Sequence, residues 1–106
     1  MGRKFLGEFE QIVLLALARV GEGAYAVSIH DEILKTAGKS VSIPAVYVTL
    51  SRLEKKGLVA SQMGEPDARP GGRAKRHFAL TRRGTDALEK TRQVFDRLWN
   101  GLELAK

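Results

Sequence analysis

The chain has 106 residues, of which 43% are apolar and 28% are charged. This size and composition are typical of one globular domain and exclude a chain that is disordered throughout. The sequence contains no cysteine, which excludes disulfide frameworks, thiol nucleophiles and cysteine-ligated zinc. The longest unbroken apolar run, residues 12–18, is far too short to span a membrane, so we expect a cytoplasmic protein.

The net charge of +6 is concentrated in one short stretch. Six bases and no acid lie between residues 69 and 83, whereas the rest of the chain holds 12 bases and 12 acids. A local basic patch on an otherwise balanced chain indicates a polyanionic partner, nucleic acid first and an anionic membrane surface second. A solvated basic face without a partner is the alternative, so the arrangement of the predicted elements must decide.

Apolar residues at helical spacing predict a first helix over residues 5–20 and a second over residues 26–37. Gly38 is placed to cap the second helix at its C-terminal end. Leu14 and Leu15 give the first helix a second apolar face, which a domain of this size can hardly cover by itself. We therefore expect a second copy of the chain to cover it.

A third helix is predicted between Ser42, its expected N-cap, and Gly57, with Pro44 in the first turn, where its missing N–H costs nothing. Its buried stripe consists of apolar residues that step by three, four and three: Ile43, Val46, Leu50 and Leu53. The opposite face carries small, hydroxylated and basic side chains, namely Ala45, Val48, Ser51, Arg52 and Lys55, with Tyr47 and Thr49 on its flanks. Such a face is suited to close approach to a groove, although an ordinary exposed helix face is the alternative on this pattern alone.

Two strands and a long helix are predicted in the C-terminal half. The strands are expected over residues 58–63 and 75–80, joined by a long hairpin loop, residues 64–74, that carries Arg69 and Arg73. Thr81 is expected to cap the last helix. Within that helix a short heptad seam with Val94 and Trp99 on its flanks is formed by Leu88, Thr91, Phe95, Leu98, Leu102 and Ala105.

The predicted order of elements is helix, helix, helix, strand, basic loop, strand, long helix. This order is that of a winged helix-turn-helix, in which the third helix enters the major groove and the hairpin loop is the wing. We therefore expect a mainly α fold with a small β-hairpin (α+β). It comprises a winged helix-turn-helix DNA-binding domain over residues 1–80 and a C-terminal dimerisation helix over residues 81–106, packed as one compact unit.

Two motifs in this order resemble those of the PadR family of winged-helix transcriptional regulators. The first is SIPAVY at residues 42–47 with LSRLEKKGLV at residues 50–59. The second is GGRAKRHFALT at residues 71–81, with Gly84 and Leu88 following, and Tyr25 fits the aromatic-containing turn before the second helix. The resemblance covers nearly the full chain, and the single C-terminal helix is similar to that of the short subfamily.

The resemblance implies a homodimeric repressor that binds a double-stranded DNA operator and whose affinity is set by a small molecule. It implies that Tyr47 approaches the DNA backbone and that Arg73 and Lys75 are basic wing residues, although PDARP at residues 66–70 is an extra segment of the wing. The residues of the third helix and the basic residues of the hairpin together give the expected DNA-binding set. Its members are Ser42, Ala45, Tyr47, Val48, Thr49, Ser51, Arg52, Lys55, Arg69, Arg73, Lys75 and Arg76.

A pocket for an effector is a further expectation. Trp99, the only tryptophan, lies one position past Leu98 of the seam. With Phe95, and with Phe5 and Phe9 of the first helix, it would line an apolar cavity between subunits that accepts a small hydrophobic or aromatic molecule. Plain packing at the interface is the alternative interpretation of Trp99.

Catalysis and metal binding have little support in the sequence. His30 and His77 lie in separate elements, and no nucleophile and base can be paired by their spacing, so we expect no enzyme, no catalytic residue, no metal and no cofactor. His30 is expected to be a partly buried, hydrogen-bonded structural residue. His77 is expected to point outward from Phe78, where a structural role and a contact with phosphate are both open.

Two other classes of function remain as alternatives. A winged-helix module that binds protein or RNA without an effector is disfavoured by the polar, basic outward face of the third helix and by the lack of an exposed aromatic set on which single-stranded bases could stack. A membrane-surface protein is disfavoured because the bases lie around a predicted loop and strand instead of on an amphipathic helix, so no membrane partner is expected.

Overall fold

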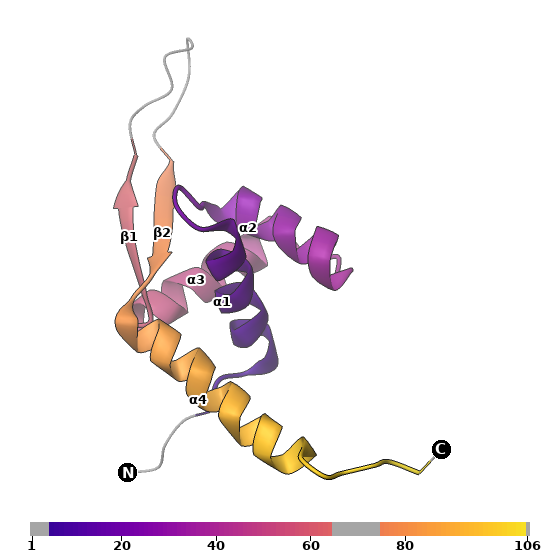
Figure 1. Ribbon diagram of the computed structural model, residues 1–106. Coiled ribbons are helices and arrows are strands. Elements are labelled where there is room, and N and C mark those ends of the chain that lie inside the picture. Colours follow the sequence, from indigo (N-terminus) through magenta and orange to yellow (C-terminus); the bar gives the residue numbers. More distant parts are fainter. Residues whose placement is uncertain (1–4, 65–74, 106) are drawn as a thin grey trace.

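The computed structural model describes residues 5–64 and 75–105. In chain order the elements are α1 (Glu8–Val20), α2 (Ala26–Glu32), the π-helical turn η1 (Ile33–Ala37), α3 (Ile43–Lys55), β1 (Val59–Met63), β2 (Arg76–Leu80) and α4 (Arg82–Trp99). The hairpin of β1 and β2 stands beside the first three helices, and α4 runs below them, away from the hairpin (Figure 1). The expected mainly α fold with one hairpin and a long last helix is confirmed.

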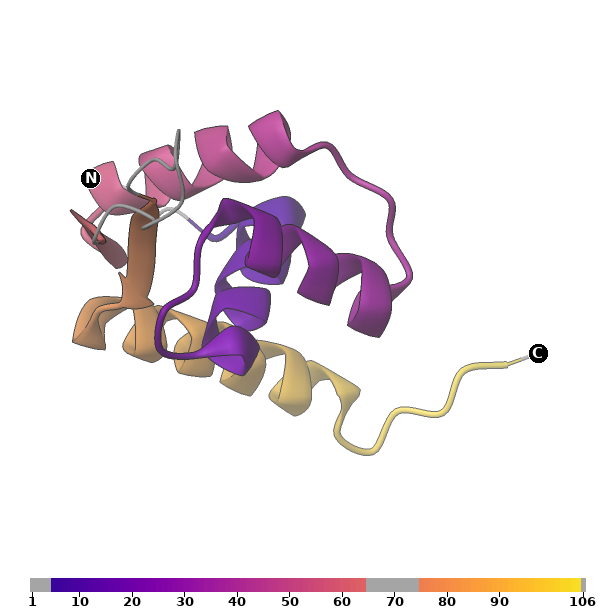
Figure 2. The ribbon, with the colours of Figure 1, turned by 90° about the horizontal axis from the view of Figure 1, so that it is seen from above.

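The hydrophobic core lies where α1 meets the other elements. Seen from above, α1 lies between α3 and α4, and it contacts both (Figure 2). The largest buried side chains come from α1, α2, η1, α3 and β1, and they are Val13, Leu14, Leu17, Ile29, Ile33, Val46, Leu50, Leu53 and Val59. Each such side chain stabilises the fold by about 1.5–3 kcal/mol relative to its exposed state, so the outward faces of the elements rest on a fixed core.

The boundaries of the first two helices differ from those expected. α1 begins at Glu8, where Glu10 Oε1 accepts a hydrogen bond of 3.0 Å from the Gly7 backbone N–H. The second helix loosens into the π-helical turn η1 before it ends at Gly38, which is left-handed (φ 66°) and acts as the predicted C-cap. Leu15 is exposed as expected, whereas Leu14 is fully buried in the chain's own core and needs no second copy to cover it.

The hairpin is antiparallel and is fixed to the helices through the middle of β2. Val59 pairs with Leu80 and Met63 pairs with Arg76. Both strands start within one residue of the predicted positions. The Phe78 backbone N–H donates a 2.8 Å hydrogen bond to the Ala24 carbonyl, which ties β2 to the turn before α2. The greater part of the predicted loop, including Arg69 and Arg73, lies outside the described residues.

Helix α4 begins as predicted and ends earlier. The Thr81 hydroxyl accepts a hydrogen bond of 3.1 Å from the Gly84 N–H and donates one of 2.7 Å to the Gly57 carbonyl. The helix ends at Trp99, and Leu102 and Ala105 of the expected seam lie beyond it, because Asn100 leaves the helical conformation (ψ 122°) and Gly101 follows with a positive φ of 75°. None of the helices among the described residues is long and apolar enough to cross a bilayer.

Candidate nucleic-acid interface

The outward face of α3 presents a continuous stripe to solvent. Ser42 caps the helix as predicted, because its hydroxyl accepts a hydrogen bond of 3.1 Å from the Ala45 N–H. Opposite the core-facing Val46, Leu50 and Leu53, the stripe steps by four, three and four through Pro44, Val48, Ser51 and Lys55. Arg52 and Lys55 are exposed near the C-terminal end of α3, and Val48 is 50% exposed at its middle. The face therefore passes from apolar at its N-terminal end to basic at its C-terminal end.

Two residues of α3 differ in exposure from what was expected. Thr49 is only 6% exposed and packs at the edge of the core, so it is not part of the outward face. Ile43, expected in the buried stripe, is 39% exposed. Helical side chains lean toward the N-terminus, so that of the first residue projects past the end of the helix. The outward face thus loses one hydroxyl, and the N-terminal end of α3 exposes one apolar side chain.

Tyr47 joins α3 to the hairpin. Its ring meets the ring of Phe78 edge-on, with centroids 6.1 Å apart and planes at 84°, a favourable arrangement for two aromatic rings. Phe78 is buried, whereas 42% of Tyr47 remains exposed. The hydrocarbon part of Tyr47 is therefore held by β2 while the residue still reaches solvent on the flank of the stripe.

The described bases of the hairpin are engaged by neighbours that the sequence did not reveal. Lys75 Nζ lies 4.3 Å from the centre of the Tyr25 ring, a cation–π contact with the residue before α2. Arg76 Nη1 donates to the Ser61 hydroxyl at 2.9 Å, and that hydroxyl donates to Glu54 Oε2 of α3 at 2.7 Å. These contacts orient the two bases and connect the hairpin to α2 and α3.

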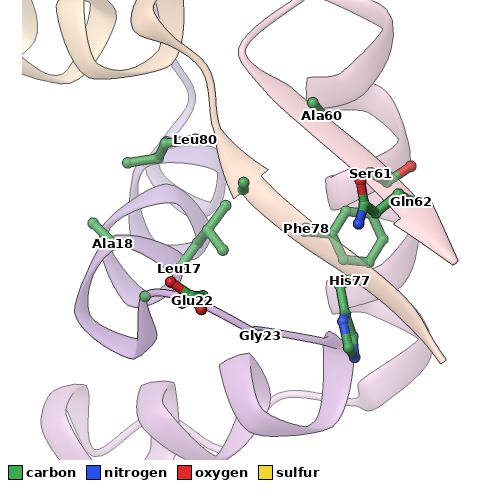
Figure 3. A pocket seen from close by; sticks show the side chains of 12 residues that line it. Leu17, Ala18, Glu22, Gly23, Ala60, Ser61, Gln62, His77, Phe78 and Leu80 are labelled. Carbon is green, nitrogen blue, oxygen red and sulfur yellow. The ribbon is translucent and has the colours of Figure 1, made fainter. Parts of the chain in front are cut away.

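His77 does not stand out from the hairpin in the way that was expected. It is half-buried, its ring centre lies 6.3 Å from that of Tyr25, and a side chain at Gly64 would meet its ring at 2.8 Å. The ring lies at one end of a groove between the turn after α1 and the hairpin, lined mainly by small and apolar residues including Ala18, Gly23 and Ala60 (Figure 3). This position favours the structural interpretation of His77.

The four residues expected around an effector do not form one pocket within a single copy of the chain. Phe5 lines a groove against α4 together with Leu6 and Val94, and Phe9 is half-buried against the core. Phe95 and Trp99 do not line that groove; they are 51% and 56% exposed on α4.

Within the described part of the chain, His30 and the acidic side chains form no metal site. His30 Nδ1 lies 2.9 Å from Asp31 Oδ1 with its side chain 21% exposed, which confirms a partly buried, hydrogen-bonded histidine. Within residues 5–64 and 75–105, no three carboxylate or imidazole side chains come together in a way that could hold a metal ion.

Comparison with known proteins agrees with this geometry. The sequence model of the family described as "Transcriptional regulator PadR-like family" matches residues 13–90. RosR from H. salinarum has a similar structure (TM-score 0.69) at 26% identity, over 92% of this chain and 81% of that one. A PadR-like transcription factor from Bacteroides fragilis gives a TM-score of 0.70 at 26% identity, over 85% and 82%. A PadR family regulator from Clostridium difficile, 24% identical, shares the fold (TM-score 0.67, 89% and 96%). No curated protein matches the sequence.

Proposed function

The chain belongs to the PadR-like family of transcriptional regulators, and from this premise we propose that it is a homodimeric repressor released from its operator by a small hydrophobic or aromatic molecule. The coarser function, that of a DNA-binding regulator of transcription and not an enzyme, follows from the family itself. Repression, the dimer and the effector are the proposed parts.

The observation that carries DNA binding by this chain is the outward face of α3. The helix starts at a side-chain cap, rests on the core through Leu50 and Leu53, and turns Val48 and Arg52 to solvent. In helix-turn-helix proteins the N-terminal residues of such a helix meet the base edges in the major groove. Lys75 and Arg76 lie at the loop end of the hairpin and would meet the flanking phosphates.

A dimer is supported by the apolar surface that α4 leaves uncovered. Phe95, Leu98 and Trp99 are 51%, 68% and 56% exposed in one copy, and Leu15 of α1 is 51% exposed. Large exposed apolar side chains gathered on one helix are typical of an interface between subunits. A two-fold dimer would place two α3 helices in successive major grooves, with half-sites about 10 base pairs apart.

The proposed effector site lies at this interface. Trp99 and Phe95 are both on the uncovered side of α4, so a two-fold axis there would bring them near their counterparts and form an apolar cavity from both subunits. A molecule in that cavity releases DNA only if it binds the released dimer more tightly than the DNA-bound one.

Binding to duplexes selected from a random pool tests the DNA-binding part of the proposal. Enriched duplexes should contain two related half-sites, and a dimer that neutralises about six phosphates should lose roughly 10³-fold in affinity between 50 and 200 mM salt. No retained duplex, or an affinity that does not depend on salt, would contradict operator binding. Preferential retention of single-stranded RNA would favour the alternative of an RNA-binding module.

A further inference from the structure

The first two turns of the outward face of α3 lack side chains that read bases by hydrogen bonds. Pro44, Ala45 and Val48 carry no polar side-chain atom. The Ser42 hydroxyl accepts the cap hydrogen bond from Ala45, and Tyr47 lies on the flank against Phe78. The polar members of the stripe, Ser51 and Lys55, come only in later turns. The part of the helix that enters a major groove most deeply therefore offers mainly hydrocarbon.

Val48 is the centre of this apolar surface. It is 50% exposed, it lies one turn after Pro44 and one turn before Ser51, and it belongs to the side of α3 opposite the core. A branched apolar side chain in this place gains nothing from contact with water. It gains from contact with another apolar group, and the only one that a base pair presents in the major groove is the C5-methyl group of thymine.

We propose that Val48, with Pro44 and Ala45 beside it, recognises a thymine C5-methyl group in each operator half-site. This inference rests on the proposed binding of duplex DNA and adds what the recognition helix reads. Cytosine at the same position carries only a hydrogen atom at C5, so the apolar contact with Val48 would be missing. The same contact thus favours thymine over cytosine.

Deoxyuridine tests this contact because it differs from thymidine only by the missing methyl group. In a duplex selected from a random pool, each thymine is replaced in turn by uracil, and the affinity of the full chain is measured by fluorescence anisotropy at fixed salt. We expect one position in each half-site to lose about fourfold in affinity, and the duplex changed in both half-sites to lose about tenfold or more. Thymines outside the half-sites should be replaceable without loss.

A matched pair of variants tests whether Val48 is the residue that contacts the methyl group. Val48→Ala shortens an exposed side chain and should bind the thymine and uracil duplexes with equal affinity. Lys55→Ala, in the same stripe, should weaken binding to both duplexes by the same factor. An unchanged preference for thymine in Val48→Ala, or no effect of uracil at any half-site position in the wild type, would overturn the inference while leaving duplex binding intact. Failure to bind any duplex would instead overturn the proposed function.

Discussion

The rings of Tyr47 and Phe78 meet edge-on with their centroids 6.1 Å apart, so helix α3 and strand β2 share one aromatic contact. Phe78 is also tied through its backbone N–H to the Ala24 carbonyl before α2. The hairpin, α3 and the turn before α2 are therefore fixed together, which holds the proposed DNA-binding residues of α3 and the hairpin in one arrangement. In a dimer, this rigidity leaves the distance between the two α3 helices as the variable that an effector would alter.

Tyr47→Phe keeps this ring contact and removes only the hydroxyl group. We expect the free energy of unfolding to change by less than about 0.5 kcal/mol. Affinity should fall about fivefold to tenfold for selected and scrambled duplexes alike, because a hydrogen bond to a phosphate carries no sequence information. Anisotropy titrations with both duplexes measure this, and a loss confined to the selected duplex would mean that Tyr47 reads a base instead.

Glu10 and Lys56 should make the stability of the fold depend on pH. Lys56 Nζ lies 2.6 Å from Glu10 Oε2, and this pair links the start of α1 to the residue after α3. Burial of the carboxyl group favours its neutral form, but the hydrogen bonds from Lys56 and from the Gly7 N–H outweigh it and hold the pKa of Glu10 below its ordinary value of 4.5. A lowered pKa in the folded state contributes stability that is complete above the unfolded pKa and is lost as the pH falls through the folded pKa.

Urea denaturation at pH 7 and pH 3.5 measures this contribution. Glu10→Gln should lower the free energy of unfolding by about 0.5–1 kcal/mol at pH 7, a small effect because the pair is partly exposed to solvent. At pH 3.5 the loss should be smaller, because protonation of Glu10 weakens the pair. Glu8→Gln, an exposed change in the same turn, should shift neither value appreciably. An equal loss at both pH values would show that Glu10 acts by packing alone.

Gly84 cannot be replaced without moving the first turn of α4. A Cβ atom at this position would lie 2.1 Å from the Leu58 carbonyl oxygen, which belongs to the backbone and cannot turn aside. Gly84→Ala should therefore lower the free energy of unfolding by about 3 kcal/mol or more, a large share of the stability of a small domain. Thr85→Ala, an exposed change at the next residue, should have almost no effect, and equal stability of the two variants would contradict the close contact.

Local features of the fold could be predicted from the sequence because they depend on neighbours in the chain. The caps at Ser42, Gly38 and Thr81 need only the residues of the next or preceding turn, and they are found where the sequence placed them. The π-helical turn η1 was not predicted, since its residues also fit an ordinary helix. The end of α4 at Trp99 was missed because a heptad pattern continues through Leu102, although Gly101 was the available signal.

The candidate site was less predictable because its details depend on contacts between distant elements. Whether Thr49 faces the core or the outward side of α3 is decided by how closely the neighbouring elements cover the edge of this helix. The periodicity of the sequence does not specify this. Nor does any spacing in the sequence bring Lys75 over Tyr25, or join Arg76 through Ser61 to Glu54. The basic side chains that the sequence indicated as DNA-binding, Lys75 and Arg76, are thus positioned by partners that only the tertiary structure shows.

Leu98→Asp should separate the proposed dimer without unfolding its subunits. In one copy Leu98 is 68% exposed, so an aspartate there costs the isolated subunit little, whereas at an interface it would be a buried charge without a partner. Analytical ultracentrifugation should give a folded monomer for this variant and a dimer for the wild type. Arg97→Asp, an exposed change at the adjacent position, should remain dimeric; a monomeric wild type at micromolar concentration would contradict the interface.

Trp99 gives a direct measurement of effector binding, because it is the only tryptophan of the chain and lies on the uncovered side of α4. Planar hydrophobic compounds that enter the proposed cavity should quench its fluorescence and should lower the affinity for the selected duplex in the same range of concentration. The Leu98→Asp monomer has only half of the cavity, so the same compounds should bind it at least tenfold more weakly. If no compound quenches the wild-type signal, or if every quencher leaves the affinity for DNA unchanged, Trp99 packs the interface and does not sense a ligand.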